Sequence, residues 1–371
     1  MARVVLAMSG GVDSSVAAHL LLRAGHEVIG VFMRHGEQSP VACAVPAGAA
    51  ADNSLPIVER ADHKQGCCTA SDAEDARRIA DRLAIPFYAL NLQTEFRRII
   101  DYFVAEYAAA RTPNPCVMCN NWIKFGKLFD YADSVGAEFV ATGHYARLVP
   151  QPAGPPALCR GHDPGKDQSY VLAGIQPDLL PHMLLPVGDY QKTEIRRLAG
   201  ELGMRVADKK DSQEICFVAT GQHDRFVRSR RGGSDFAGDI VTTEGRVVGR
   251  HDGIESFTIG QRKGLGVAFG TPRFVVRIEA DTRRVIVGEK ADLARHKLTA
   301  ERVNWLVDPP GNPFRCLAQI RYNSAATSAM VEPLPENRWR VTFDEPCYGV
   351  APGQAVVCYD ADRVLGGAWI E

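Results

Sequence analysis

The chain has 371 residues, of which 46% are hydrophobic, and a net charge of −1 from 43 lysines and arginines against 44 aspartates and glutamates. This length suffices for two or three domains, and no run reaches the roughly 18 apolar residues of a membrane-spanning helix, so we expect no membrane partner. The near-neutral charge excludes nucleic-acid binding by the field of the whole molecule, and an RNA partner needs a local basic surface.

The amino terminus predicts no signal peptide, because a short apolar stretch leads directly into a glycine loop without a small-residue cleavage site. Ten cysteines without a secretion signal indicate a reducing compartment, in which thiols serve chemistry, metal binding or packing. We therefore expect a cytoplasmic protein.

The first half of the chain alternates apolar strand-like runs with helical patterns. Strands are expected at residues 3–8, 27–33, 86–92 and 138–143, and helices from about residue 14, over 72–83 and over 95–110. This alternation predicts a doubly wound, mostly parallel α/β sheet, which binds ligands at the carboxyl ends of its strands. Residues 35–66 break the pattern and are expected to form a long surface loop.

The second half of the chain has a different sequence pattern. After about residue 221, short alternating runs separated by glycines predict β-rich, barrel-like structure in two small units that meet near residues 290–300. We therefore expect an α/β domain over residues 1–220, a central β-rich domain over 221–292 and a barrel-like domain over 293–371.

The stretch SGGVDSS (residues 9–15) lies between the first strand and the first helix. Its two glycines let backbone N–H groups close on an anion, and the dipole of the helix that follows favours negative charge. The lysine of the common phosphate loop is missing. The stretch suits a pyrophosphate that departs as a unit. The simpler interpretation is a strand-to-helix turn capped by serine or aspartate.

SGGVDSS resembles the pyrophosphate loop of the ATP pyrophosphatases, which cleave ATP between the α and β phosphates and adenylylate an oxygen. The remaining motifs resemble, in the same order, those of the bacterial tRNA-specific 2-thiouridylases: TPNPCVMCNNWIKFG (112–126), ATGHYAR (141–147), GKDQSYVL (165–172), KKDSQEICF (209–217) and FTIGQRKGLG (257–266). The resemblance implies an adenine nucleotide alpha hydrolase-like fold, with residues 1–220 as the ATP pyrophosphatase catalytic domain.

The resemblance also implies the reaction. The wobble uridine of tRNAs for Lys, Glu and Gln is adenylylated at its C2 oxygen and then receives sulfur from a cysteine persulfide. ATP with Mg²⁺ is the implied cosubstrate. The implied partners are tRNA and a sulfur-relay protein fed by a cysteine desulfurase.

Two cysteines match the working pair of the family. By the resemblance Cys216 carries the persulfide and Cys119 is the nucleophile that pairs with it by disulfide exchange. Both lie in polar, lysine-flanked stretches that favour the thiolate. The alternative for any cysteine is a small buried hydrophobe, which is the role expected elsewhere: Cys67, Cys68, Cys159, Cys316, Cys347 and Cys358.

The resemblance also assigns binding residues position by position. The nucleotide is expected at Ala7, Met8, Ser9, Gly10, Gly11, Val12, Asp13, Ser14, Met33 and Gly143. The tRNA is expected at Asn114, Pro115, Cys116, His144, Lys166, Asp167, Gln168, Arg321, Tyr322 and Gln354. Without the resemblance, Lys166 and Arg321 read as solvated charges and His144 as a turn histidine. The arginine-rich residues 223–231 suit either phosphate contact or a solvated helix face.

Cys116 departs from the family pattern, since many members carry aspartate there. An acid or base role at this position is thereby in doubt, because a thiol has a higher unperturbed pKa than a carboxylate. The CxxC spacing with Cys119 leaves an iron–sulfur cluster on Cys116, Cys119 and Cys216 open, but we favour metal-free chemistry and expect no metal site. Two other functions stay open, an amide-forming ATP pyrophosphatase synthetase and a non-catalytic, nucleotide-sensing RNA-binding module.

Overall fold

Five parallel strands form the sheet of the amino-terminal part, in the order β3-β2-β1-β4-β7. They are β1 (Arg3–Ala7), β2 (Glu27–Arg34), β3 (Phe87–Asn91), β4 (Phe139–Ala141) and β7 (Met183–Leu184). The structure is a computed structural model that describes residues 1–34, 70–209, 215–218, 221–232 and 236–371. The first four strands confirm the sequence prediction, and the expected loop 35–66 lies outside the described residues.

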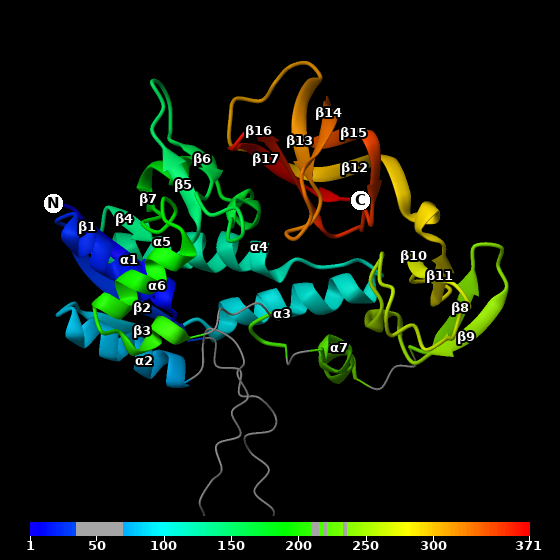
Figure 1. Cartoon of the computed structure of the whole chain (residues 1–371), viewed down its shortest axis with the longest axis horizontal. Coiled ribbons are helices and arrows are strands. Elements are labelled where there is room, and N and C mark those ends of the chain that lie inside the picture. The colour runs from blue at the N-terminus through cyan, green and yellow to red at the C-terminus, as the bar shows by residue number, and fades with distance from the viewer. Residues whose placement is uncertain (35–69, 210–214, 219–220, 233–235) are drawn as a thin grey trace, which may run out of the picture.

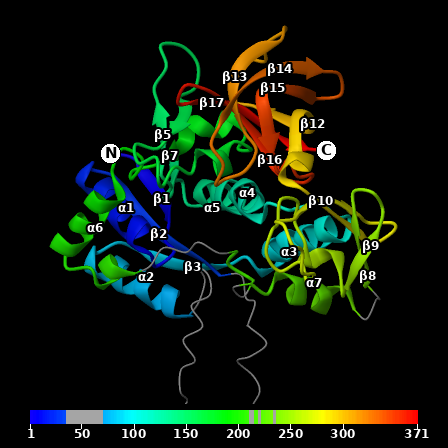
Figure 2. The same ribbon diagram turned by 45° about the vertical axis from the view of Figure 1, so that its right-hand side comes forward.

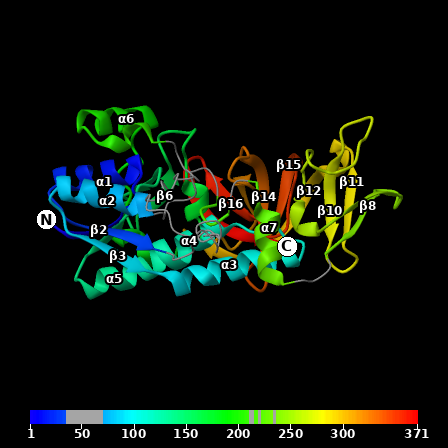
Figure 3. The same ribbon diagram turned by 90° about the horizontal axis from the view of Figure 1, so that it is seen from below.

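Helices cover both faces of this sheet, as Figure 3 shows from below. Along β1, Val4 and Leu6 pack into one apolar cluster with three helices, while Val5 and Ala7 pack into another on the opposite face. The first face carries α1 (Val12–Arg23), α2 (Ala70–Arg82) and α6 (Lys192–Glu201), and the second carries α5 (Leu128–Ser134) with the π-helical stretch Asn120–Lys127. The prediction of a doubly wound sheet is therefore confirmed.

Helix α3 (Gln93–Ala108) leads from the sheet to the β-rich parts (Figure 1). Its buried residues Phe103 and Tyr107 share an apolar cluster with Val227 of α7 (His223–Arg231), while α4 (Pro115–Cys119) returns toward the sheet. Short 3-10 helices lie at Ser169–Leu172, Pro177–His182, Arg205–Asp208, Ile254–Ser256 and Lys290–Leu293. Over the described ranges, no helix has both the length and the apolar character needed to cross a membrane.

The rest of the chain is β-rich, as the sequence predicts. A four-stranded sheet of order β10-β11-β8-β9 comes first, with strands β8 (Gly238–Thr242), β9 (Val247–His251), β10 (Phe274–Glu279) and β11 (Arg284–Gly288). Six further strands form a barrel that the pairing of β12 with β17 closes. These are β12 (Ala294–Trp305), β13 (Phe314–Gln319), β14 (Thr327–Leu334), β15 (Arg338–Tyr348), β16 (Ala355–Asp360) and β17 (Arg363–Ile370).

A hairpin from the first half of the chain joins the barrel. Strands β5 (Ala146–Val149) and β6 (Ala157–Arg160) pair with each other, and Cys159 of β6 pairs with Arg363 of β17. Figure 2 shows the barrel above α4 and the four-stranded sheet beside α3. The sequence analysis missed this hairpin, because its two strands are short and its partner lies far along the chain.

Candidate active site

The glycine loop between β1 and α1 has the geometry of an anion cradle. Gly10 adopts a φ of +71°, and a Cβ there would lie 2.2 Å from the carbonyl oxygen of Asp72 in the first turn of α2. The amide of Ser9 donates to Oγ of Ser14 at 3.2 Å, which fixes the loop. Gly11 is the N-cap residue of α1, and the first N–H groups of a helix have no partner within the helix. They are available to an anion.

Three of the residues assigned to the nucleotide support the loop from the protein interior. Ala7, Met8 and Val12 are buried, and the amide of Met8 donates to the carbonyl oxygen of Val31 at 2.8 Å. Their side chains pack into the clusters on the two faces of the sheet. These three side chains are therefore not accessible to a ligand in the loop.

A buried lysine contacts the aspartate of the loop. Nζ of Lys192, at the start of α6, lies 2.8 Å from both carboxylate oxygens of Asp13, and the hydroxyl of Tyr145 donates to Oδ1 of Asp13 at 2.6 Å. Gly143 lets β4 approach α1, because a Cβ there would lie 2.8 Å from the amide nitrogen of Ser14. The sequence analysis missed Lys192, since no local pattern marks a lysine that reaches across 179 positions.

Asn114 sets the start of α4, which carries the CxxC stretch. Its Oδ1 accepts from the amide of Val117 at 3.3 Å, and Pro115 occupies the first helical turn, where its missing N–H costs nothing. Asn114 is buried, whereas Cys116 is exposed one residue into the helix. The sequence TPNPC therefore forms a capped helix start that presents the Cys116 thiol to solvent.

The barrel holds the chain just before α4. Nε2 of Gln354 donates to the carbonyl oxygens of Thr112 and Pro113, at 3.1 Å each. Gly353 lies so close that a Cβ there would approach the Thr112 carbonyl oxygen to 2.9 Å. Gln354, assigned to tRNA by the resemblance, thus has a structural role in the described arrangement.

Cys119 and Cys216 border the same apolar cluster although they lie far apart in the sequence. Both are half-buried, Cys119 at the end of α4 and Cys216 in the short segment before α7. Met33, at the carboxyl end of β2, borders the cluster as well. Its buried members are Leu92, Phe96, Ile99, Ile100, Met118 and Ile123. Among the described residues, no three His, Cys, Asp or Glu side chains are grouped to hold a metal ion.

His144 is buried beside the loop and is neutral. Its Nε2 lies 3.3 Å from Nζ of Lys124 and its Nδ1 lies 2.7 Å from Oγ1 of Thr142. Because an ammonium only donates, Nε2 accepts and Nδ1 carries the proton that it donates to Thr142. Burial, with a smaller effect of the Lys124 charge, holds the pKa of His144 well below its usual value.

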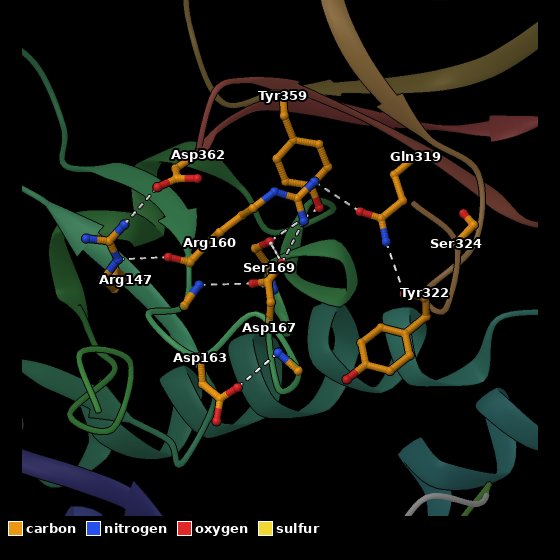
Figure 4. Close-up of polar contacts among 12 residues, drawn as sticks. Arg147, Arg160, Asp163, Asp167, Ser169, Gln319, Tyr322, Ser324, Tyr359 and Asp362 are labelled. Carbon is orange, nitrogen blue, oxygen red and sulfur yellow. Dashed lines mark hydrogen bonds and ion pairs between the residues drawn. The ribbon is translucent and has the colours of Figure 1, made fainter. Parts of the chain in front are cut away.

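A polar network ties the β5–β6 hairpin to the barrel, as Figure 4 shows. Nη1 of Arg160 donates to Oδ2 of Asp167 at 2.8 Å, and its Nη2 donates to Oε1 of Gln319 at 3.2 Å. The guanidinium also stacks on the ring of Tyr359, with 3.6 Å to the ring centre. The network fixes the relative positions of hairpin and barrel.

The same network also holds the backbone at Tyr322. Nε2 of Gln319 donates to the carbonyl oxygens of Arg321 and Tyr322 at 3.0 Å each, and the Tyr322 side chain is exposed. Partial burial raises the pKa of Tyr322, and the charges of Asp167 and Cys116 add to this effect. The Tyr322 ring also lies against that of Tyr170, with 6.4 Å between the ring centres.

Two other residues assigned to tRNA hold their own loop. Asp167 accepts hydrogen bonds from both the amide and the hydroxyl of Ser169, at 3.0 Å each, and Oε1 of Gln168 accepts from the amide of Tyr145 at 2.9 Å. Lys166 lies half-buried beside them. Through Gln168, the loop after β6 is therefore hydrogen-bonded to the residue that precedes β5.

Arg321 links the barrel to the four-stranded part. Its Nη2 donates to the carbonyl oxygen of Ile259 at 2.7 Å, and its guanidinium lies beside Gly349. Burial lowers the pKa of Arg321 from its usual value. Arg321 is therefore not the solvated charge that the sequence alone suggests.

The parallel sheet with a glycine loop after its first strand, followed by a β-rich part and a closed barrel, defines an adenine nucleotide alpha hydrolase-like protein. Models described as tRNA methyl transferase HUP domain, tRNA methyl transferase PRC-barrel domain and aminomethyltransferase beta-barrel domain match residues 2–220, 224–289 and 295–370. The chain belongs to the tRNA-specific 2-thiouridylase family, which confirms the resemblance seen in the sequence.

Two relatives illustrate this similarity. The tRNA-specific 2-thiouridylase MnmA of Rhodopirellula baltica is 58% identical over 387 residues, which cover 100% of this chain and 96% of the relative. The protein of the same name from Geotalea uraniireducens is 45% identical, over 100% of this chain and 95% of its own length. A solved 4-thiouridine synthetase–RNA complex with bound ATP covers 59% of this chain and 45% of its own, at 19% identity and a TM-score of 0.36, too distant to bear on function.

Proposed function

We propose that this protein is an ATP-dependent tRNA-uridine 2-sulfurtransferase that acts on the wobble uridine of tRNAs for Lys, Glu and Gln. The observation that carries this proposal is the convergence of Cys119 and Cys216 on one apolar cluster, in a chain whose full length matches the thiouridylases. The cluster lies where β2 and β3 end, which is the edge at which parallel sheets bind ligands.

The first step is adenylylation of the uridine. The glycine loop binds the β and γ phosphates of ATP through its backbone N–H groups, and Lys192 holds Asp13 beside them. The C2 oxygen attacks the α phosphorus, and pyrophosphate leaves. Magnesium arrives with ATP as part of the substrate.

The second step replaces the activated oxygen with sulfur. The thiolate of Cys119 attacks the inner sulfur of a persulfide on Cys216, forms the Cys119–Cys216 disulfide and releases the outer sulfur, which bonds to C2 as AMP leaves. A thiol reductant then restores both cysteines, and a sulfur-relay protein fed by a cysteine desulfurase reloads Cys216. The sulfur-transfer and regeneration reactions use only thiols, so no metal is assigned to them.

A basic cleft where the four-stranded sheet meets the barrel supports RNA binding. It has a volume of about 430 Å³ and is lined by one carboxylate, Glu371, and four cations. The cations are Arg277, Arg295, Lys297 and Arg340. Ile259 and Pro352 also line it, and their carbonyl oxygens bind Arg321 and Thr112, so the cleft adjoins the segments that position α4. We infer that this cleft binds phosphates of the tRNA.

The family relationship also supports the remaining assignments. We place the catalytic domain at residues 1–220, the central domain at 221–292 and the barrel domain at 293–371, and we assign the protein to the cytoplasm, where tRNA and reduced thiols coexist. The structural partners of Gln354, Asp167 and Gln168 favour an indirect role for them in binding tRNA.

Mass analysis of tRNA nucleosides after incubation with ATP and a sulfide source tests the activity, with 2-thiouridine as the expected product. An amide-forming synthetase instead keeps its activity when Cys216 is replaced by alanine. An RNA-binding module binds ATP and tRNA without releasing pyrophosphate. Stoichiometric iron in anaerobically purified protein that vanishes in Cys116→Ala would restore the cluster alternative, whereas colourless active protein supports the thiol route.

A further inference from the structure

Lys209 lies near the end of the α/β part in the sequence, 199 positions after Gly10, but its side chain contacts the glycine loop. Its Nζ donates to the carbonyl oxygen of Gly10 at 3.0 Å, to Oδ1 of Asp72 at 2.7 Å and to Oδ2 of Asp75 at 2.9 Å. Partial burial acts to lower the pKa of Lys209, but the hydrogen bonds to the two carboxylates outweigh it and raise the pKa above its usual value. The ammonium is therefore charged, and these three acceptors match its three hydrogens.

The Gly10 carbonyl oxygen matters because its direction fixes that of the next amide. In a planar trans peptide, the C=O of Gly10 and the N–H of Gly11 point in opposite directions. With the carbonyl held against Lys209, the Gly11 N–H points away from α2. Glycine at a φ of +71° has other accessible conformations, so the orientation of this peptide needs a restraint from outside the loop.

We propose that Lys209 is a positioning residue that holds the Gly10–Gly11 peptide in the orientation that presents the Gly11 N–H to the pyrophosphate part of ATP. The identity of this anion rests on the proposed function. Lys209 itself does not bind phosphate in this role, because Asp72 and Asp75 occupy two of its hydrogens and neutralise its charge. This explains how a phosphate loop without its own lysine keeps its shape.

The position of Lys209 in the sequence also connects this restraint to the cysteine chemistry. Lys209 opens the stretch KKDSQEICF, which also carries Cys216. Its backbone is fixed as well, since its carbonyl oxygen accepts from Nη2 of Arg196 at 3.2 Å. One residue thus links the start of the persulfide stretch to the loop that binds ATP.

The test compares Lys209→Met, Lys209→Arg and a matched control, Lys127→Met, which removes an exposed lysine that also binds a carboxylate, Asp130, at 2.8 Å. Direct binding of ATP, of inorganic pyrophosphate and of adenosine is measured for each full-length variant. Lys209→Met is expected to weaken ATP and pyrophosphate about ten-fold, the range of a hydrogen bond to a charged group, and to leave adenosine unchanged. Lys209→Arg restores part of the loss, and Lys127→Met changes nothing.

Wild-type affinity of Lys209→Met for pyrophosphate would overturn the proposal, and so would an equal loss for adenosine, which indicates general disruption of the domain. If Lys209→Met does not fold, Lys209→Ala with and without ethylammonium keeps the question decidable. Recovery of pyrophosphate affinity with the added amine supports the proposal, and its absence in a folded variant contradicts it. If the wild-type protein binds pyrophosphate but does not release pyrophosphate from ATP when tRNA is added, the proposed function is contradicted. The role of Lys209 in the loop is not affected by that result.

Discussion

The ammonium of Lys192 lies 2.8 Å from both carboxylate oxygens of Asp13, which joins the start of α6 to the first turn of α1. Because the Lys192 side chain is almost fully buried, its loss leaves the Asp13 carboxylate with Tyr145 as its neutral partner. We expect Lys192→Met to lower the free energy of unfolding by about 1–3 kcal/mol and to slow pyrophosphate release. Denaturant titration and a pyrophosphate assay check the two effects, and an unchanged release rate in a folded variant contradicts the assignment of Lys192 to the nucleotide site.

Substitutions at Gly10 and Gly25 distinguish the effect of backbone strain from the effect of a steric clash. Both adopt positive φ, +71° and +83°, but a Cβ at Gly10 meets the Asp72 backbone whereas one at Gly25 meets nothing within 4 Å. Gly25→Ala is expected to cost roughly 1 kcal/mol of stability and to bind ATP normally. Gly10→Ala should cost more and lose ATP binding. Equal ATP affinities in the two folded variants would refute the cradle.

The two cysteines should be separable from the nucleotide step. Cys119→Ser and Cys216→Ser are expected to abolish 2-thiouridine formation while tRNA-dependent pyrophosphate release continues, since the two steps use different groups. Cys316→Ser, at a half-buried cysteine of the barrel, is the matched control and should thiolate normally. Normal thiolation by Cys216→Ser excludes the persulfide role.

The basic cleft should dominate the salt dependence of tRNA binding. Arg295→Ala with Lys297→Ala removes two of its cations, and we expect the slope of log K against log salt to fall in magnitude by about 1 to 2. Arg23→Ala with Arg205→Ala removes two equally exposed cations from the α/β part and should leave the slope unchanged. Identical slopes for both double variants would place the RNA elsewhere.

His144 should make stability depend on pH. Its pKa is lowered in the folded protein, so the unfolded chain binds the proton more tightly, and stability is complete above the unfolded pKa of about 6.5 and declines as the pH falls below it. Relative to His144→Gln, the wild type should lose up to about 1.4 kcal/mol per pH unit in that range. Because burial also lowers the pKa of His19 and His251, only the difference between the two proteins is diagnostic. Parallel pH curves would show that His144 is solvated.

Regular periodicity made the α/β part predictable. The alternation along β1, with Val4 and Leu6 toward one face and Val5 and Ala7 toward the other, is a local property of the sequence, and so are the glycines of the loop. The contacts of Lys192 and Lys209 span 179 and 199 positions, and no local pattern encodes them. The grouping of Cys119 with Cys216 was accessible only through family resemblance.

The assigned tRNA residues show the same limit. The family resemblance assigned Gln354 and Asp167 to tRNA, but it cannot distinguish a side chain that contacts a ligand from one that holds the loop beside it. Asp167 is engaged with Arg160 and Ser169, and Gln354 with two carbonyl oxygens, and both arrangements depend on three-dimensional neighbours.

The pairing of β6 with β17, together with the hold of Gln354 on Thr112, also bears on how such a chain evolves. A recombination that replaced the barrel with an unrelated RNA-binding module would remove the partner strand of the β5–β6 hairpin and release the start of α4. The gene segments for the two parts are therefore expected to be inherited together, because neither is a self-contained cassette.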